Sequence, residues 1–537
     1  MTRSNRLPRW VIAALAMPAL VFVGVFYLVP VVSLAAEAIG RGAISEVLDD
    51  SALPRIVWFT IWQAALSTLL TIIVGLVPAW LLARYEFKGR RAITALVTVP
   101  FVLPTVVVGA AFLAILPDSL DHGVVAILMA HVFFNVAVVV RGVGGLWEQL
   151  PNDLTAAART LGASPFRAMR EITLPLLAPA LFASASIVLL FTFTSFGVVR
   201  LLGGPGNPTL EVEIWQRATR FGDVGVAAVL SIAQLVVLAA AVMWFSRLQR
   251  RQRFAIGLRP LDQRRRVSTT RLRIMVFGIG ATIVVAICTP MAALVERSLR
   301  TGNGHSLAAW RAVFTGERSA SARPPAAAVD ALGSLTVSLR FAVIAMVISV
   351  IIGASASFAI AAMGHAGRFL DAGVMLPLGT SAVTIGFGLL IAFDQAPFDW
   401  RAAPLLIPVG HALVATPFVV RSILPVIRAI DPQLRSAAAT LGASPLRAWS
   451  EVDLRLAARP LVIGAGFALT VSLGEFGATT FLTRQGRATL PIAIEQLLNR
   501  PGALLHAEGY VLATILATLT FVAIGTVELA RRGRQHA

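Results

Sequence analysis

The segment TAAARTLGASPFRAMREITLPLLAPAL, residues 155–181, returns later in the chain as RSAAATLGASPLRAWSEVDLRLAARPL, residues 435–461. The two copies share the core T-L-G-A-S-P-x-R-A, and the second core begins 280 residues after the first. A register held over that length indicates two homologous halves in tandem. Without a gap from position 131 to 216, the same offset also joins His131 with His411, Arg141 with Arg421, Phe196-Gly197 with Phe476-Gly477, Thr209-Leu210 with Thr489-Leu490, and Gln216 with Gln496.

Each copy predicts a helix that stops and a second helix that starts at once. Alanines favour helix before Gly162, and glycine is the residue type expected just past a helix C-terminus. Ser164 can then cap the next helix, and Pro165 is tolerated at its first position. We call the two loops that carry this break the first elbow (residues 151–178) and the second elbow (residues 431–459).

Opposite charges at four-residue spacing support the second helix of each elbow. Arg167 and Glu171 have this spacing in the first elbow, and Arg447 and Glu451 have it in the second. One such segment is equally well explained as an ordinary connector between two helices. Two copies, each polar and each between apolar segments, favour a functional role.

The composition is typical of a membrane protein. Of the 537 residues, 57% are hydrophobic and 14% are charged, and the mean hydropathy is +0.80, whereas about a quarter of the residues are charged in soluble domains. The formal charge of +19 would suggest nucleic acid in a soluble protein. Here the arginines cluster between apolar segments, so membrane orientation explains them and no nucleic-acid partner is expected. The one cysteine, Cys288, allows no intrachain disulfide and no cysteine metal cluster.

Twelve apolar segments, six in each half, predict an all-α integral membrane protein. The first segment follows a basic N-terminus and competes with a signal peptide, but it is too long for the apolar core of one. The predicted spans are approximately 10–36, 56–82, 92–116, 124–143, 179–202 and 224–245 in the first half, and 274–294, 335–362, 370–393, 405–427, 461–482 and 510–529 in the second.

Charge predicts the orientation of these spans. We place the halves at residues 1–246 and 274–537, joined by a basic linker at 247–273. The N-terminus, segment 84–91, both elbows, the linker and the C-terminal tail are basic and fall on one side of this topology, which the positive-inside rule makes cytoplasmic together with both termini. The outer loop at 297–334 also carries arginines and goes against the rule mildly. Both halves start on the same side, so the repeat is parallel.

The sequence contains no pattern typical of an enzyme. It has no H-E-x-x-H, no G-x-S-x-G and no paired cysteines, and we expect no cofactor and no metal. A nucleotide-binding P-loop needs a lysine followed by serine or threonine, but the only lysine, Lys88, precedes Gly89. If ATP drives this protein, the ATPase is therefore a separate polypeptide.

The elbows resemble the "EAA" loop of ABC importer permeases of the binding-protein-dependent type. That loop reads E-A-A, three residues, G, nine residues, I-x-L-P. The first elbow departs from it in an alanine at the glutamate position, and the second lacks the glutamate and the closing proline. The aligned residues are Ala156-Ala157-Ala158, Gly162, Ile172 and Leu174-Pro175 in the first elbow, and Ser436-Ala437-Ala438, Gly442, Val452 and Leu454-Arg455 in the second.

This resemblance implies a type I ABC importer permease fold, with twelve transmembrane helices in two six-helix halves. It also implies that each elbow forms a short coupling helix docked in a groove of a cytoplasmic ATPase dimer. A substrate-binding protein would work on the outer face of a bacterial inner membrane. The coupling residues implied are Ala157, Ala158, Gly162, Ser164, Pro165 and Arg167 in the first elbow, and Ala437, Ala438, Gly442, Ser444, Pro445 and Arg447 in the second.

Two fused halves look like the thiamine and iron(III) permease branch of that family. AHVFFN at 130–135 and LLGGPGNPTLEVEIWQ at 201–216 look most like the thiamine permeases. The implied function is import of thiamine by alternating access, with iron(III) or another small solute such as a polyamine as the alternative. An ion-coupled secondary transporter is a hypothesis from another class, but it needs ionisable pairs near the membrane midplane and the spans offer few. The repeated elbow argues against a scaffold without transport.

One carboxylate, Glu475, lies within a predicted apolar span, where such groups are costly and usually face a cavity or a partner. An attractive role is a counter-charge for a cationic solute. The alternative is structural, in which an arginine such as Arg484 neutralises Glu475 and holds helices together. The residues that we expect along the substrate path are Glu475, its first-half counterpart Ser195, and the adjacent Phe476 and Phe196.

Two histidines, His131 and His411, occupy matched positions on the fourth span of each half. We favour interhelical hydrogen bonds for both over a ligand or proton-relay role. Arg141 and Arg421 lie near the ends of the same spans, where long basic side chains reach the membrane surface.

Overall fold

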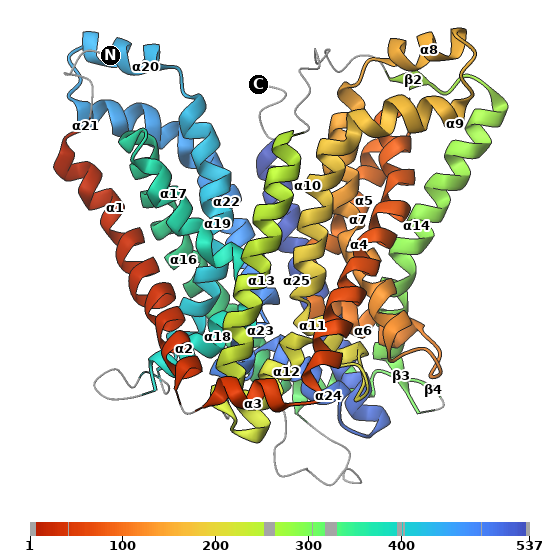
Figure 1. Ribbon diagram of the computed structural model, residues 1–537, viewed down its shortest axis with the longest axis vertical. Coiled ribbons are helices and arrows are strands. Elements are labelled where there is room, and N and C mark those ends of the chain that lie inside the picture. The colour runs from red at the N-terminus through yellow and green to blue at the C-terminus, as the bar shows by residue number, and fades with distance from the viewer. Residues whose placement is uncertain are drawn as a thin grey trace. The chain divides into compact units, whose positions relative to one another are not determined.

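In the computed structural model (Figure 1), the described residues are helical almost throughout. A helix satisfies all its backbone hydrogen bonds within one segment, which a bilayer interior demands. Linker residues 252–263, outer-loop residues 317–329 and the two chain ends lie outside the described residues. The structure describes residues 7–40, 42–251, 264–302, 304–316, 330–394, 400, 403–484 and 486–532.

The helices of the first half, up to the linker, are α1 (Arg9–Val23), η2 (Gly24–Leu28), α2 (Val29–Ile39), α3 (Ala43–Asp49), α4 (Leu53–Arg84), α5 (Arg90–Val102), α6 (Thr105–Ile115), α7 (Val124–Gln149), α8 (Asn152–Thr160), α9 (Pro165–Ala168), η3 (Met169–Thr173), α10 (Leu174–Phe193), α11 (Phe196–Leu202), α12 (Leu210–Gln216), η4 (Arg217–Phe221) and α13 (Val224–Arg251).

The helices that follow the linker are α14 (Thr270–Leu299), α15 (Ala308–Thr315), α16 (Ala331–Met363), α17 (Gly367–Met375), η5 (Leu376–Gly379), α18 (Ala382–Ala392), α19 (Leu406–Ala429), α20 (Pro432–Thr440), α21 (Pro445–Ala448), η6 (Trp449–Leu454), α22 (Arg455–Gly474), α23 (Gly477–Leu482), α24 (Leu490–Leu498) and α25 (Ala503–Arg532). Four short strands complete the described chain: β1 (Tyr85–Glu86), β2 (Arg265–Arg266), β3 (Arg300–Thr301) and β4 (Gly304–His305).

Ten helices of the described chain are long and apolar enough to cross a membrane. Two more pass the same test only as bent pairs: α5 meets α6 at 104°, and α17 with η5 meets α18 at 101°. The expected total of twelve spans is reached when each bent pair counts as one span. The predicted spans at 92–116 and 370–393 are therefore not single helices.

Both breaks have a local cause. Leu103 stands before Pro104, whose ring pushes the preceding residue out of the helical region, and Leu103 accordingly has φ −66° and ψ 143°. At the second break, the Ser381 hydroxyl accepts a hydrogen bond from the Val383 backbone N–H at 3.1 Å and so caps the start of α18. Each bent span consequently has a helix start inside the bundle.

The fifth span of each half ends earlier than predicted. The helix that begins at Pro165 ends at Phe193, and Ser195 then precedes the separate short helix α11. In the second half the helix ends at Gly474, and Glu475 precedes α23. Ser195 and Glu475 therefore lie at breaks between helices, which corrects the expectation that Glu475 lies within a span.

Packing divides the chain into two compact units that differ from the sequence halves. The first span belongs to the unit of the second half, where α1 packs on α16 and α2 packs on α18. Conversely, most of α14 belongs to the unit that holds α4, α7 and α10. The boundaries predicted for the halves from the repeat stay a prediction. One unit comprises Asp50–Glu213 and Ala233–Arg297, and the other comprises Met1–Asp49, Ile214–Ile232 and Ser298–Ala537.

The core of each unit repeats the same close helix crossing. In one unit a Cβ added to Gly75 of α4 would lie 2.8 Å from Val139 of α7. In the other, a Cβ added to Gly353 of α16 would lie 2.7 Å from Val419 of α19. Real Cβ atoms do not approach other atoms so closely, so both crossings require glycine, as small-residue contacts between membrane helices commonly do.

The end of the linker is fastened to the first half. Strand β2 pairs in parallel with β1, with Tyr85 opposite Arg265. Arg264 donates to the Glu86 carboxylate at 3.1 Å and also contacts Glu148, close to the first elbow. The linker was expected to begin at residue 247, but α13 continues to Arg251.

Candidate functional site

The first elbow has the predicted break. Helix α8 ends at Thr160, and Gly162 follows in the left-handed conformation with φ 86°, which is unfavourable for residues with a Cβ. The Ser164 hydroxyl accepts a hydrogen bond from the Arg167 backbone N–H at 3.2 Å and caps α9. Pro165 stands at the first position of that helix, as predicted.

The second elbow repeats this backbone. Gly442 has φ 82°, and Ser444 accepts from the Arg447 backbone N–H at 3.3 Å. The Asp431 carboxylate adds a cap at the start of α20, where it accepts from the Gln433 backbone N–H at 2.8 Å. The matched sequences therefore adopt matched conformations.

A π-helical turn, η3 or η6, links each elbow to its fifth span. Such turns contain one residue more than an α-helical turn and frequently mark functional sites. Nothing in the residue pattern indicates them, so the sequence did not predict them. Through η3, the short helix α9 continues without interruption into a 29-residue helix, Pro165–Phe193.

Each elbow carries an apolar side chain at its tip. Leu161 is 89% exposed and Leu441 is 88% exposed, each directly before the left-handed glycine. Phe166 of the first elbow is 76% exposed, and its counterpart Leu446 is 40% exposed. Sequence reasoning missed these four residues, although their place inside the repeated core was the available signal. Exposed apolar side chains on a polar loop are typical of a contact surface.

The alanines assigned to coupling are divided between surface and interior. Ala157 and Ala437 are exposed, whereas Ala158 and Ala438 are half-buried against their own elbow. One face of each short helix is thus covered by the protein and the other is open.

Ion pairs distinguish the elbows. The predicted pair forms in the first elbow, where Arg167 Nε lies 3.1 Å from the Glu171 carboxylate. In the second elbow Glu451 instead contacts Arg455, at 2.7 Å. There Arg435 also donates from Nε to both carboxylate oxygens of Asp453 at 3.0 Å, and the Asp453 side chain is buried.

Glu475 makes a complete set of contacts at the start of α23. Its two carboxylate oxygens accept hydrogen bonds from the backbone N–H groups of Ala478 and Thr479, both at 3.0 Å. The Thr479 hydroxyl lies 2.8 Å from the same carboxylate, and His411 Nε2 lies 3.5 Å from it. The expected neutralising residue Arg484 donates instead to backbone carbonyls.

Both histidines form the predicted hydrogen bonds to other helices, His411 through two ring nitrogens and His131 through one. His411 is hydrogen-bonded at both ring nitrogens, to the Ser472 and Thr479 hydroxyls at 2.7 Å. His131 Nδ1 lies 3.0 Å from the Ser67 hydroxyl, and its Nε2 has no hydrogen-bond partner within the described part of the chain.

The first half lacks the capping carboxylate. Ser195 precedes α11 with no side-chain hydrogen bond to that helix. Phe196 and Phe476 are both buried, 4% and 3% exposed, and pack within their own units. The four residues expected along a substrate path thus lie at equivalent breaks, and only the second break carries a charge.

Within the described residues, the chain has ten to twelve candidate membrane spans, two of them bent, and a repeated exposed elbow, which is the architecture of an integral membrane protein. Residues 71–254 match the family model described as "Binding-protein-dependent transport system inner membrane component". This match, with the relatives described next, fits a permease of two fused halves with the type I ABC permease fold.

Relatives resemble the chain over nearly its whole length. The thiamine transport system permease protein of Salmonella typhimurium is 26% identical over 98% of this chain and 97% of its own. The corresponding protein of Brucella abortus is 27% identical over 94% and 93%. A sulfate transport system permease protein of Salmonella typhimurium is 28% identical over 42% of this chain and 88% of its own, so that protein matches less than half of this chain.

Proposed function

We propose that this chain is the permease subunit of an ATP-driven importer of thiamine. The observation that carries the proposal is full-length similarity to proteins named as thiamine transport system permeases, which covers 98%, 94% and 90% of the chain for the relatives from Salmonella, Brucella and Escherichia coli. Iron(III) or a polyamine remains the alternative cargo, and an ion-coupled secondary transporter remains the alternative class.

The elbows act in this proposal as the docking sites of a separate cytoplasmic ATPase dimer. Leu161 and Leu441 insert between ATPase side chains, and the left-handed glycine behind each leucine keeps the tip narrow. Because α9 continues into the fifth span, displacement of the first elbow moves a rigid helix of about 43 Å. Rotation of the two fifth spans then opens the solute path alternately to the two sides of the membrane.

The proposed orientation places both elbows and both chain ends in the cytoplasm of a bacterium. A substrate-binding protein delivers the solute at the opposite face. A test uses single cysteines in a Cys288→Ser background and an impermeant thiol reagent on whole cells. Positions in 84–91 and in both elbows are expected to be protected, and Asp118 to be labelled. Labelling of an elbow from outside would overturn the orientation.

Glu475, Ser195, Phe476 and Phe196 stay a prediction as substrate-path residues. The contacts of Glu475 support a role in positioning α23, because its oxygens are occupied by backbone N–H groups and its nearest cationic candidate is His411. In this proposal Glu475 acts on the path by fixing α23.

The cargo is tested by reconstitution. The full chain is co-purified with its ATPase and reconstituted into proteoliposomes. ATP is supplied on the side of the ATPase, and the binding protein with radiolabelled thiamine is supplied on the opposite side. ATP-dependent uptake that excess unlabelled thiamine abolishes is expected. Uptake that iron(III) or spermidine abolishes, with thiamine ineffective, would assign the alternative cargo, and uptake driven by an ion gradient without ATP would refute the class.

A further inference from the structure

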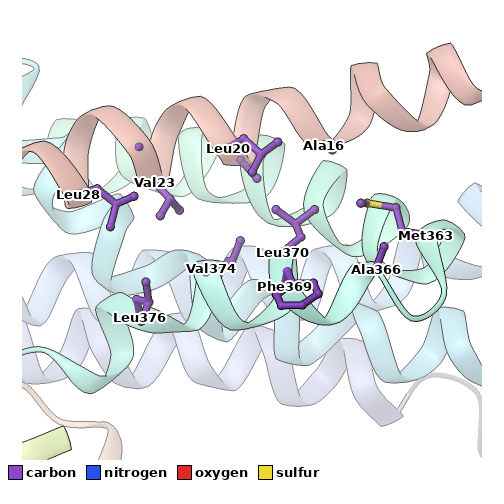
Figure 2. A pocket seen from close by; sticks show the side chains of 13 residues that line it. Ala16, Leu20, Val23, Leu28, Met363, Ala366, Phe369, Leu370, Val374 and Leu376 are labelled. Atoms are coloured by element: carbon purple, nitrogen blue, oxygen red, sulfur yellow. The ribbon is translucent and has the colours of Figure 1, made fainter.

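The unit that contains most of the second half holds an apolar pocket and a buried polar network. The pocket lies between α1 with η2 and α17 with η5, and Figure 2 shows Leu20 and Leu28 facing Phe369 and Leu376 across it. None of the 13 residues that line the pocket is charged or polar, so it offers no fixed partner to a polar group. The network lies at the break between α22 and α23 and joins α19, α22 and α23 by hydrogen bonds.

A histidine bridges two helices at the centre of this network. His411 of α19 lies 2.7 Å from the Ser472 hydroxyl through Nδ1 and 2.7 Å from the Thr479 hydroxyl through Nε2. Ser472 lies in the last turn of α22, Thr479 lies in α23, and all three residues are buried. The ring therefore holds the end of the fifth span and the start of the next helix at a fixed separation.

The hydrogen bonds of the network all run toward the Glu475 carboxylate. The Thr479 hydroxyl donates to Glu475 at 2.8 Å, so its oxygen accepts from His411, whose ring proton is on Nε2. Nδ1 then accepts from the Ser472 hydroxyl. Each proton is used once, and hydrogen bonds that run in one direction polarise and strengthen one another.

Helix α23 also packs tightly against α18, the second part of the bent third span. A Cβ added to Gly386 of α18 would lie 2.4 Å from the Ala478 Cα. A Cβ added to Gly477 would lie 3.1 Å from the Ala382 Cβ. Contacts this close leave little room for α23 to move relative to α18, so a displacement of α23 also displaces α18.

The matched positions of the first half do not form this network. The offset of 280 residues pairs Thr479 with Val199, which has no hydroxyl. The matched histidine, His131, contacts the Ser67 hydroxyl of α4, the second span, at 3.0 Å. Within the described residues, only the histidine of the second half is therefore hydrogen-bonded to the helix that follows its fifth span.

We propose that His411 is a positioning residue for transport, because it couples the fifth span of the second half to α23 and, through α23, to α18. In this proposal, which rests on the proposed function, displacement of the second elbow moves η6 and α22. The contacts of His411 with Ser472 and Thr479 then carry α23 along with α22. Because His411 is buried, it acts through these helices and not by contact with the solute.

The role of the bridge is tested by removing one hydroxyl. Thr479→Val introduces the residue that the first half has at Val199 and keeps the shape of the side chain. In proteoliposomes that hold the ATPase and are supplied with the binding protein and radiolabelled thiamine, the number of thiamine molecules imported per ATP hydrolysed is expected to fall roughly tenfold. Thr479→Ser keeps the hydroxyl and is expected to restore this ratio. An unchanged ratio in Thr479→Val would overturn the coupling role.

Substitution of the histidine separates the two contacts of the bridge. The amide of glutamine reaches about as far as Nε2 and keeps the contact with Thr479, whereas the amide of asparagine reaches about as far as Nδ1 and keeps the contact with Ser472. Loss of the Ser472 contact matters less, because α19 also packs directly on α22. His411→Gln is therefore expected to retain more of the import ratio than His411→Asn, and the reverse order would contradict the proposal.

Hydrogen exchange reports on the bridge without any solute. The backbone amides of Ala478 and Thr479 are expected to exchange roughly tenfold faster in His411→Asn than in the unaltered complex. Ser67→Ala is the matched control, since it removes the buried hydroxyl that contacts His131 and leaves α23 untouched. This control is expected to lower the thermal unfolding midpoint but to leave the exchange at α23 and the import ratio unchanged. An equal fall of the ratio in Ser67→Ala and Thr479→Val would reduce the effect to general destabilisation.

Failure of the proposed function is recognised separately. An unaltered chain that imports no thiamine with ATP would refute the cargo or the class, while faster exchange at Ala478 and Thr479 in His411→Asn would still support the bridge. An unaltered chain that imports thiamine, with normal ratios in both His411→Asn and Thr479→Val, would refute the positioning role alone.

Discussion

In the first elbow, Thr155 and Thr173 occupy the positions at which the second elbow has Arg435 and Asp453. The backbones of the two elbows agree, with left-handed glycines at φ 86° and 82° and serine caps on the same backbone N–H. In the first elbow Arg167 Nε contacts both oxygens of the exposed Glu171 carboxylate, four residues away. In the second, Arg435 contacts both oxygens of the buried Asp453 carboxylate and ties α20 to η6. The shared residues thus specify the shape, and the differing residues specify how firmly it is held.

The helix breaks that follow the fifth spans also differ between the halves, and again the second half has the additional side-chain contacts. Glu475 caps α23 and contacts His411, whereas Ser195 leaves α11 without a side-chain cap. At both the elbow and the break, the second half therefore has a buried carboxylate contact that the matched residues of the first half do not form.

The largest expected effect comes from the elbow glycines. Gly162→Asp is expected to lower thiamine-stimulated ATPase activity on the order of tenfold or more, as for loss of a central contact residue. A Cβ at either glycine meets no atom within 4 Å, so the substitution causes no packing clash. It instead strains the left-handed backbone of the elbow and alters the docking surface. Gly442→Asp is expected to cost less, because Arg435 and Asp453 hold the second elbow.

The assay for these variants is ATPase activity in proteoliposomes, with co-purification of the ATPase as a second readout. Gly162→Asn is the control, since asparagine tolerates the left-handed conformation and adds no charge. Full stimulated activity in both aspartate variants would refute the docking role.

Removing one member of the second elbow's ion pair is the next largest change. Arg435→Thr leaves the buried Asp453 carboxylate unpaired and is expected to destabilise the protein by about 1–3 kcal/mol. This is less than the roughly 3–5 kcal/mol for a fully buried pair, because Arg435 is partly exposed. The readout is the thermal unfolding midpoint of the purified complex.

The double change Arg435→Thr with Asp453→Thr reproduces the residues of the first elbow and removes the unpaired charge. It is expected to recover most of the lost stability. A double variant no more stable than Arg435→Thr would show that the ion pair is not what distinguishes the elbows.

Glu475→Gln sharpens the comparison at the breaks. An amide has one neutral acceptor oxygen where the carboxylate has two charged ones. One backbone N–H of α23 therefore loses its acceptor and the other keeps only a neutral one, at an expected cost of about 1–2 kcal/mol. Thiamine uptake is expected to fall while the ATPase stays bound. Ser195→Ala, at the matched position, is expected to have little effect on either thiamine uptake or stability.

Uptake and thermal stability are measured on the same preparations. Lowered stability with normal uptake would make Glu475 purely structural and remove the substrate-path prediction. Lowered uptake with unchanged stability would instead assign it to the path.

Local signals predicted the elbows and most spans correctly. Gly162 and Ser164 act through their own dihedral angles and one hydrogen bond three residues away, so sequence alone suffices. Hydropathy located the spans for the same reason. Pro104 was a local signal for the bend at Leu103, but a hydropathy window averages over the whole apolar segment and does not detect one proline.

Contacts between distant residues were beyond sequence reasoning. Whether α1 packs with its own half or the other depends on which faces fit, and both halves offer apolar faces. Arg435 pairs with Asp453, which lies 18 residues away across a turn. Glu475 accepts hydrogen bonds from backbone N–H groups, and the sequence does not indicate which backbone groups a side chain will contact.

The smallest expected effect concerns a feature that the two elbows share, the serine cap. Ser164→Ala and Ser444→Ala each remove one cap hydrogen bond, from Arg167 N–H and Arg447 N–H respectively. Loss of such a cap costs about 1 kcal/mol, and neither cap contacts the ion pair of the second elbow. Hydrogen exchange at these two amides should therefore accelerate by a similar factor in both variants, roughly fivefold. Ser→Thr at either position keeps the hydroxyl and should restore protection. A clearly larger acceleration in the first elbow would mean that the Arg435–Asp453 pair also supports the cap, so that the two shapes are not independently specified.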